Sequence, residues 1–149
     1  MPPVFPVYLN ALPSDTRTVE VVMEQLLDRS NGMWTKFGLR SLSSKDSYFQ
    51  SGDNYWTSLI WLNINYLAVV SVFEDANHPG EYPVTKRLRS KIRLAYLEIQ
   101  TGLTVMVVKS YVATGFIWEV YDGDFGNGFN NHPFTGWSAL IVNITAELY

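Results

Sequence analysis

Hydrophobic residues in the first part of the chain recur at the spacing of an α-helix. After Ser14, the apolar side chains follow one another at intervals that place them on one helical face. These positions are Val19, Val22, Met23, Leu26 and Leu27. A Ser-Asp pair comes before them and Asn31-Gly32 comes after them, a start and a stop that are typical of helix ends. The pattern predicts an amphipathic surface helix with one buried face.

The pattern changes twice in the next part of the chain. Residues 33–54 hold no sustained period and many small polar side chains, which predicts a long irregular connection. The stretch from Tyr55 to Phe73 then contains no charged residue, and its length alone would allow a membrane span. Asn63 and Asn65 interrupt it, however, and an unpaired amide in lipid costs of order 1 kcal/mol or more. We therefore predict a helix that is buried on all sides inside a protein, and no membrane segment.

Two further helices are predicted downstream. A stripe of apolar residues runs from about Val84 to Tyr111, and it consists of Val84, Leu88, Ile92, Tyr96, Ile99, Leu103 and Met106. Gly102 is a weak point in this helix, where glycine costs about 1 kcal/mol relative to alanine. Residues 116–121 have the composition of an extended segment, and Thr135 is a suitable cap for a last helix. The sum is an all-α architecture with long loops.

The uncharged helix sets a requirement for its surroundings. A chain of 149 residues normally forms one domain. Only three or four other helices are predicted here, and they must cover a helix that is apolar on every side. We therefore expect the chain to belong to a larger helical assembly.

Charge and residue types limit the classes of partner. The formal net charge is −3 at pH 7, and the basic run from Lys86 to Arg93 fits the solvated face of a helix, so we expect no nucleic acid binding. Cysteine is absent, and His78 and His132 each flank a proline without partner ligands at metal-like spacing. We expect neither a metal site nor a cofactor.

Aromatic residues make up 15% of the chain, and they serve either a core or a sugar site, depending on where they lie. Three loop segments combine aromatic or charged groups with hydrogen-bonding side chains, the mixture that a carbohydrate site needs. They are Arg40 to Ser43, Asp53 to Trp56, and Trp118 to Asp122. We expect these segments to meet at one end of the helices.

Glu119 is a lone carboxylate in the last of these segments, among bulky apolar residues. It is either a solvated or ion-paired glutamate at the edge of a short strand, or a general base held in an aromatic pocket. A glycoside hydrolase needs a second carboxyl group as its acid. Asp53, Asp122 and Asp124 are the nearest candidates by type, and their spacing selects none of them.

Two other motifs carry weaker signals. The glycine-rich segment 122–128 superficially resembles a calcium loop, but Asn127 and Pro133 stand where an EF-hand has glycine and glutamate. A flexible glycine loop fits better. Asn143 begins an N-glycosylation sequon, but it lies within a helical apolar pattern, so a buried structural asparagine is at least as good an interpretation.

Four segments, taken in order, resemble a known family. They are W-T-K-F-G-L-R-S-L-S (34–43), G-D-N-Y-W-T-S-L-I-W-L-N-I-N-Y-L-A (52–68), T-G-F-I-W-E-V-Y-D (114–122) and H-P-F-T-G-W-S-A-L-I-V (132–142). Together they are similar to the C-terminal end of processing α-glucosidases I, the mannosyl-oligosaccharide glucosidases of glycoside hydrolase family 63. The similarity covers nearly all of residues 1–149.

The resemblance implies a fold and an activity. The fold is the last part of an (α/α)6 toroid, a six-hairpin glycosidase-like catalytic domain, packed against an N-terminal part that this chain lacks. The activity is inverting hydrolysis of the terminal α-1,2-linked glucose of the triglucosylated N-glycan precursor, an oligosaccharide, in the endoplasmic reticulum. No metal takes part in that chemistry.

The resemblance also implies roles for individual residues. By its place in T-G-F-I-W-E-V-Y-D, Glu119 resembles the general base that deprotonates the attacking water. The segments similar to those that line the sugar subsite contribute Arg40, Asn54, Tyr55, Trp56, Trp118 and Trp137.

The sequence departs from the family in two respects. The family typically has Arg-Gly-Pro where this chain has Thr57-Ser58-Leu59, and it has a glutamate at Asp53. The loss of an arginine that binds sugar or orients a carboxylate would weaken the site. The segment with the general acid is also missing, so we expect the chain by itself to be inactive. The alternatives are a non-catalytic remnant that binds sugar or supports a partner and, with less support, a trehalase-like hydrolase.

Overall fold

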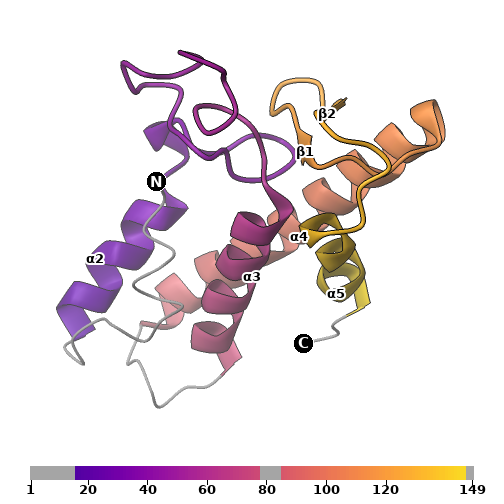
Figure 1. The fold of residues 1–149 in the computed structure, drawn as a ribbon. Coiled ribbons are helices and arrows are strands. Elements are labelled where there is room, and N and C mark those ends of the chain that lie inside the picture. Colours follow the sequence, from indigo (N-terminus) through magenta and orange to yellow (C-terminus); the bar gives the residue numbers. More distant parts are fainter. Residues whose placement is uncertain (1–15, 78–84, 147–149) are drawn as a thin grey trace.

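A computed structural model describes residues 16–77 and 85–146, and this part of the chain is mostly helical (Figure 1). Its helices are α2 (Thr16–Leu27), α3 (Leu62–Asn77), α4 (Lys86–Thr114) and α5 (Leu140–Ala146), with 3-10 turns η1 (Arg29–Asn31) and η2 (Trp137–Ala139). The strands β1 (Val120–Tyr121) and β2 (Gly128–Phe129) form a two-stranded antiparallel sheet. The all-α prediction is confirmed at this level.

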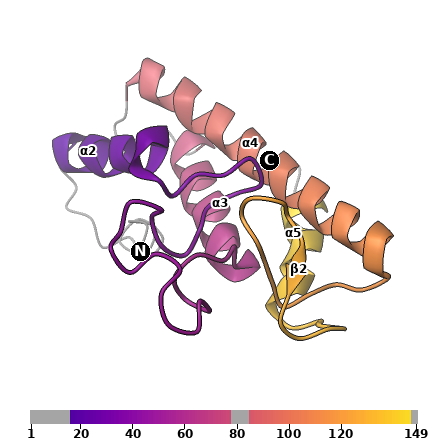
Figure 2. The ribbon, with the colours of Figure 1, turned by 90° about the horizontal axis from the view of Figure 1, so that it is seen from above.

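The long helix α4 is the support on which the other helices rest. Thr85 caps its first turn by accepting a hydrogen bond from the Leu88 N–H at 3.3 Å, and Gly115 ends it in the left-handed conformation, with φ of 76°. The predicted stripe is buried from Leu88 to Met106, whereas Val84 lies outside the described residues. α2, α3 and α5 all contact α4, and Figure 2 shows them on one side of it.

The uncharged segment is only partly helical. α3 begins at Leu62, so the prediction of a helix from Tyr55 is wrong for residues 55–61. The physical reason is local: the Asn54 side chain accepts a hydrogen bond from the Ser58 hydroxyl at 2.5 Å, and the Trp61 indole donates to the Tyr55 carbonyl at 3.2 Å. Such bonds hold the chain in a turn that competes with a helix.

Within α3, the expectation of burial on all sides is met only in part, because residues 63, 66, 67 and 70 share one helical face and are half-buried. None of residues 62–70 is exposed. Among the residues that the structure describes, no helix has the length and apolar character needed to cross a membrane. The two asparagines that interrupt the apolar run behave differently, because Asn65 is fully buried and Asn63 is half-buried.

Asn65 ties α3 to the irregular connection of residues 33–54. Its side-chain oxygen accepts from the Leu39 N–H at 2.7 Å, and its amide nitrogen donates to the carbonyls of Leu39 and Trp61, both at 2.9 Å. A buried amide that satisfies three backbone groups costs little in burial. The polar residue in the apolar run is therefore a structural clamp.

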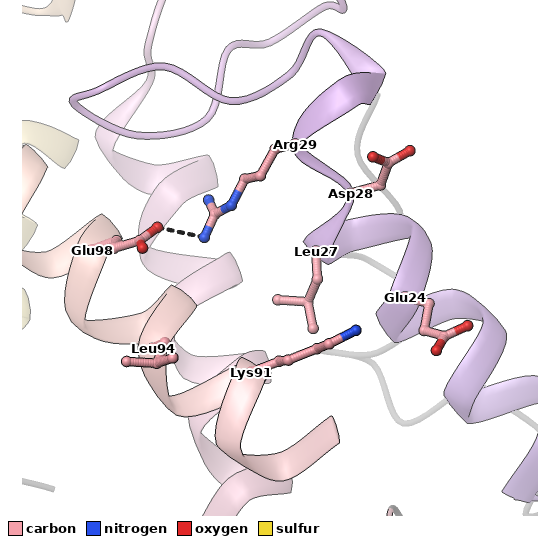
Figure 3. A pocket seen from close by; sticks show the side chains of 7 residues that line it. All are labelled: Glu24, Leu27, Asp28, Arg29, Lys91, Leu94 and Glu98. Atoms are coloured by element: carbon pink, nitrogen blue, oxygen red, sulfur yellow. Dashed lines mark hydrogen bonds and ion pairs between the residues drawn. The ribbon is translucent and has the colours of Figure 1, made fainter. Parts of the chain in front are cut away.

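The groove between α2 and α4 is lined by charged side chains (Figure 3). Arg29 forms an ion pair with Glu98 across it, and the Arg29 guanidinium lies 3.3 Å from the centroid of the Trp34 ring. The predicted solvated face of α4 is confirmed, because Lys86, Arg87, Lys91 and Arg93 are exposed and Arg89 is half-buried.

Two local predictions are wrong, and a third lies outside the described residues. The Ser14 start of the first helix precedes the described residues. The last helix is not capped by Thr135, because Gly136 occupies the cap position of η2 and makes no side-chain bond there. Asn143 is exposed on α5, so the interpretation as a buried structural asparagine is wrong. α5 buries its other face through Ile141 and Ile144, which leaves Asn143 on the outer side.

Gly102 has a packing role that cannot be inferred from its low helix propensity. A Cβ added there would lie 2.7 Å from the Phe37 carbonyl oxygen and 2.8 Å from that of Lys36, so the connection crosses α4 at this glycine. We expect Gly102→Ala to lower the free energy of unfolding by about 1–3 kcal/mol, since the clash outweighs the gain in propensity. Urea unfolding of this variant, beside Thr101→Ala on the exposed side of the helix, measures the difference. A more stable Gly102→Ala chain would contradict the packing argument.

Candidate active site

Three segments that are distant in sequence meet beside the start of α3. Ile60 forms isolated antiparallel bridges with Arg40 on one side and Tyr121 on the other. The backbones of Ile60 and Tyr121 exchange hydrogen bonds of 2.7 and 3.0 Å. Tyr55, from the segment Asp53 to Trp56, contacts Glu119 through its hydroxyl. Together these contacts join the three loop segments expected from the sequence, at the end where β1 lies in Figure 1.

The Glu119 carboxylate is buried and held at both oxygens. Only 5% of the residue is exposed. Its Oε1 accepts a hydrogen bond from the Tyr55 hydroxyl at 2.5 Å, and its Oε2 accepts one from the Asn131 side-chain amide at 2.6 Å. The two donors come from different segments, so both oxygens of the carboxylate are fixed in place. Glu119 is therefore a fixed side chain and not a solvated residue at a strand edge.

The Glu119 backbone is fixed as firmly as its side chain. Its N–H donates to the Asn131 carbonyl at 3.0 Å, and its carbonyl accepts from the Trp137 indole at 2.8 Å. The Ser138 hydroxyl donates to the Trp118 carbonyl at 2.6 Å, which anchors the preceding peptide. The loop before α5 thus clamps the start of β1, and the carboxylate has little freedom to move.

Tyr55 remains a hydrogen-bond donor over the ordinary pH range. Burial of its hydroxyl, together with the hydrogen bond to Glu119 and the charge of that carboxylate, raises the pKa of Tyr55 to about 12. A phenol with this pKa keeps its proton at neutral pH. The contact between Tyr55 and Glu119 is therefore an O–H group that faces a carboxylate.

A stack of aromatic rings adjoins the carboxylate. Trp61 lies at its centre, with Trp56 parallel to it at 3.9 Å, Tyr55 edge-on at 4.5 Å and Trp137 at 5.4 Å between ring centroids. Trp61 is buried, whereas Trp56 remains 53% exposed. An exposed indole backed by a buried one is a rigid apolar surface, of the kind on which a flat ligand face can stack.

Trp118 lies in a second aromatic contact. Its ring centroid is 3.8 Å from that of His132, and its indole N–H donates to the Thr114 hydroxyl at 3.0 Å. A Cβ added at Gly128 would lie 2.0 Å from the Trp118 ring, so β2 passes directly over the indole at this glycine. The contacts of Trp118 fix the β1–β2 hairpin against the end of α4.

Arg40 and the three candidate acids all have structural partners. Arg40 is buried and donates to Asp124 at 2.6 Å, a contact that ties down the glycine-rich loop. Asp122 accepts from the N–H groups of Asp124 and Phe125, and Asp53 accepts from the N–H of Tyr55. None of these contacts marks one of the aspartates as an acid that faces Glu119.

Asn54 contacts the segment Thr57-Ser58-Leu59, which stands where the family has Arg-Gly-Pro. The Asn54 side chain accepts from Ser58 and, at 3.4 Å, from Thr57, so these two replacements of the family pattern are absorbed into the turn. Leu59, the third, is buried beside Trp61 in a small apolar cluster. Within the described residues, no group of three or more histidine, aspartate or glutamate side chains is placed to hold a metal ion.

The structure adds three residues that sequence reasoning missed. Trp61 backs the exposed indole, Asn131 holds the Glu119 carboxylate, and Ser138 anchors the peptide before it. Ser138 follows Trp137 in one of the four recognised segments, and Trp61 lies within another. Asn131 has no comparable signal, because it is one of two adjacent asparagines in a turn and its role depends on a long-range contact.

Comparison with known proteins matches residues 2–147 to the glycosyl hydrolase family 63 C-terminal domain. The chain is 37% identical over 145 residues to a probable mannosyl-oligosaccharide glucosidase of Schizosaccharomyces pombe. It is 33% identical over 150 residues to a mannosyl-oligosaccharide glucosidase of Arabidopsis thaliana, and 34% identical over 150 residues to alpha-glucosidase 2 of the same plant. Each match covers 97% of this chain but only 17% or 18% of the relative.

Proposed function

Since the chain belongs to glycoside hydrolase family 63, we propose that it is the C-terminal part of an α-glucosidase catalytic domain in which Glu119 is the general base. The observation that carries the proposal is the buried Glu119 carboxylate, held by Tyr55 and Asn131 beside an exposed stacked indole. The proposed reaction removes the terminal α-1,2-linked glucose of the triglucosylated N-glycan precursor with inversion. Its proposed location is the endoplasmic reticulum.

The chemistry explains why a fixed carboxylate is useful. In an inverting hydrolysis, a base takes a proton from water as the water attacks the anomeric carbon, and an acid protonates the departing oxygen on the other face. The two carboxyl groups stand roughly 6.5–9.5 Å apart to leave room for the water. Glu119 supplies the base in this proposal. The acid is proposed to come from the part of the relatives that this chain does not match.

The aromatic stack next to Glu119 is the proposed sugar subsite. Trp56 presents an exposed ring, and the ring of Tyr55, 5.3 Å from it between centroids, carries the hydroxyl that donates to the Glu119 carboxylate. A pyranose is proposed to stack on Trp56, with Tyr55 between it and the carboxylate. Asn54, Trp118 and Arg40 stay predictions as sugar ligands, because the contacts that the structure gives them are with the protein itself.

The outer face of α4 is the proposed contact with the rest of the catalytic domain. Leu94, Leu97, Val105, Val108 and Val112 follow one side of the helix, and each is between 45% and 79% exposed. A hollow of ≈ 540 Å³ adjoins this stripe between α4 and residues 34–38. The chain spans less than a fifth of the relatives, so the preceding helices of an (α/α)6 toroid are the proposed occupant.

This packing proposal has a direct test in the isolated chain. A dye for exposed apolar surface should bind to it, or light scattering should detect association, because the stripe is uncovered. Replacing Val105 and Val108 by glutamate should weaken both signals. A compact monomer that does not bind the dye would contradict the proposed contact.

Glucose release by the complete gene product tests the proposed activity. Incubated with a triglucosylated N-glycan oligosaccharide, it should release glucose first as the β-anomer, because inversion at an α-linked centre gives β-glucose. Proton NMR distinguishes the two anomers before they equilibrate. Initial release of α-glucose would contradict an inverting mechanism with Glu119 as its base.

A non-catalytic remnant that binds sugar is the second candidate. The observation that favours it is the turn at Asn54, where Thr57 and Ser58 stand in place of the family's arginine and glycine and bind the asparagine instead. If the protein is such a remnant, glucose oligosaccharides should quench its tryptophan fluorescence, and the Trp56→Ala variant should lose this quenching. The protein should release no glucose. Turnover by the complete gene product would exclude it.

A further inference from the structure

We infer that Asn131 is a positioning residue for Glu119: it anchors Oε2, so that Oε1 is the oxygen that accepts the proton of the attacking water. This inference rests on the proposed function. Asn131 touches neither the water nor the sugar in this role, and it acts only through the carboxylate that it holds.

A local irregularity in the hairpin places Asn131 opposite Glu119. β1 and β2 pair Val120 with Phe129, and the same register continued by one residue would place Glu119 opposite Asn130. Instead, the Glu119 N–H donates to the Asn131 carbonyl. Asn130 is the extra residue, and it takes the left-handed conformation with φ of 64°, which asparagine tolerates better than most residues. The bulge turns the next side chain toward the carboxylate.

Asn131 then contacts Glu119 at several points. Its side-chain amide donates to Oε2 at 2.6 Å, and its own N–H lies 3.4 Å from the same oxygen. Its carbonyl accepts from the Glu119 N–H at 3.0 Å. Asn131 thus holds both the backbone and the side chain of Glu119, and this fixes the rotation of the carboxylate about its terminal bond.

The two carboxylate oxygens consequently differ in how easily a water molecule can reach them. Oε2 faces the side-chain and backbone N–H groups of Asn131. These groups do not exchange a proton with the carboxylate, and they cannot move away without breaking the contact within the hairpin. Oε1 faces the Tyr55 hydroxyl, which both donates and accepts and which belongs to a separate loop. A water between Tyr55 and the sugar can therefore reach Oε1. The raised pKa of Tyr55 agrees with this arrangement, because the phenol then stays a donor.

Kinetics of the complete gene product on a triglucosylated oligosaccharide test the inference. Asn131→Ala should lower kcat on the order of 10- to 100-fold, because a misplaced base reacts poorly, and should leave KM within about threefold. Tyr55→Phe should cost less, because Asn131 still holds Oε2 in that variant.

Asn130→Gly is the matched control. Its side chain is exposed, and glycine adopts the required φ, so its kcat and KM should match those of the wild type. Circular dichroism and the melting temperature of each variant show whether the fold is kept. An Asn131→Ala protein that is folded and has the wild-type kcat would overturn the inference, and so would one whose loss falls on KM alone.

Failure of the inference can be distinguished from failure of the proposed function. If Glu119→Gln is inactive and Asn131→Ala is not impaired, only the role of Asn131 is wrong. If Glu119→Gln keeps its activity, or the wild-type product releases no glucose, both are wrong.

Discussion

Glu119→Gln is expected to lower kcat for glucose release by the complete gene product by about 10²–10⁴-fold, the range that a general base contributes. Glutamine has nearly the same size as glutamate and keeps hydrogen-bonding atoms at both positions, so Tyr55 and Asn131 retain a partner. What it lacks is a basic oxygen that takes a proton from water. KM should change little, because the loss falls on the transition state.

The matched control for this substitution is Glu98→Gln. Glu98 is exposed on α4 and pairs with Arg29 across the groove of Figure 3, on the face that α4 turns toward α2. An exposed ion pair contributes little to stability, so this variant should keep wild-type kcat and KM. Glucose release by Glu119→Gln at the wild-type rate would end the assignment of the general base.

Asn65→Leu is expected to destabilise the chain by about 2–5 kcal/mol, although leucine suits an apolar helix. The substitution leaves the N–H and the carbonyl of Leu39 buried without the partner that they now share, and each unsatisfied buried group costs roughly 1–3 kcal/mol. The added methyl groups do not fit a site shaped for an amide. Urea unfolding followed by tryptophan fluorescence measures the loss.

Asn63→Leu serves as the comparison for this stability prediction. Asn63 lies two positions earlier on α3, is only half-buried, and has its side-chain oxygen 2.9 Å from the N–H of its own neighbour, Ile64. Its replacement should change the free energy of unfolding by less than about 1 kcal/mol, as is usual outside buried networks. Equal losses in the two variants would show that Asn65 is not a clamp.

The helices with a clear period were predictable from the sequence. The stripe from Leu88 to Met106 lies where the spacing placed it, because α4 buries one face against neighbours that all lie on the same side. The start of α3 was not predictable in the same way. An apolar run predicts that its residues are buried, but hydrogen bonds of side chains within the turn determine the backbone conformation from Tyr55 to Trp61.

The site was predictable in its parts but not in its connections. Glu119 was a candidate because it is a lone carboxylate among bulky apolar residues, and the family resemblance gave it the role of general base, which stays a prediction. What holds it was not visible, since Asn131 reaches it through a one-residue bulge and Tyr55 approaches from another loop. Gly102 also has a role that the sequence alone did not reveal. Its low helix propensity predicts a weak position in α4, whereas the close passage of residues 36 and 37 makes glycine necessary there.

Azide rescue of a Glu119→Gly variant of the complete gene product tests the central claim most directly. Azide carries no proton that a base must remove, so it can attack the anomeric carbon while the glycosidic bond breaks and the acid protonates the leaving oxygen. The account predicts that turnover of a triglucosylated oligosaccharide is lost in the variant and returns with sodium azide, with β-glucosyl azide as the product. A folded variant that azide does not rescue, or that releases glucose at the wild-type rate without it, would contradict the assignment of Glu119 as the general base.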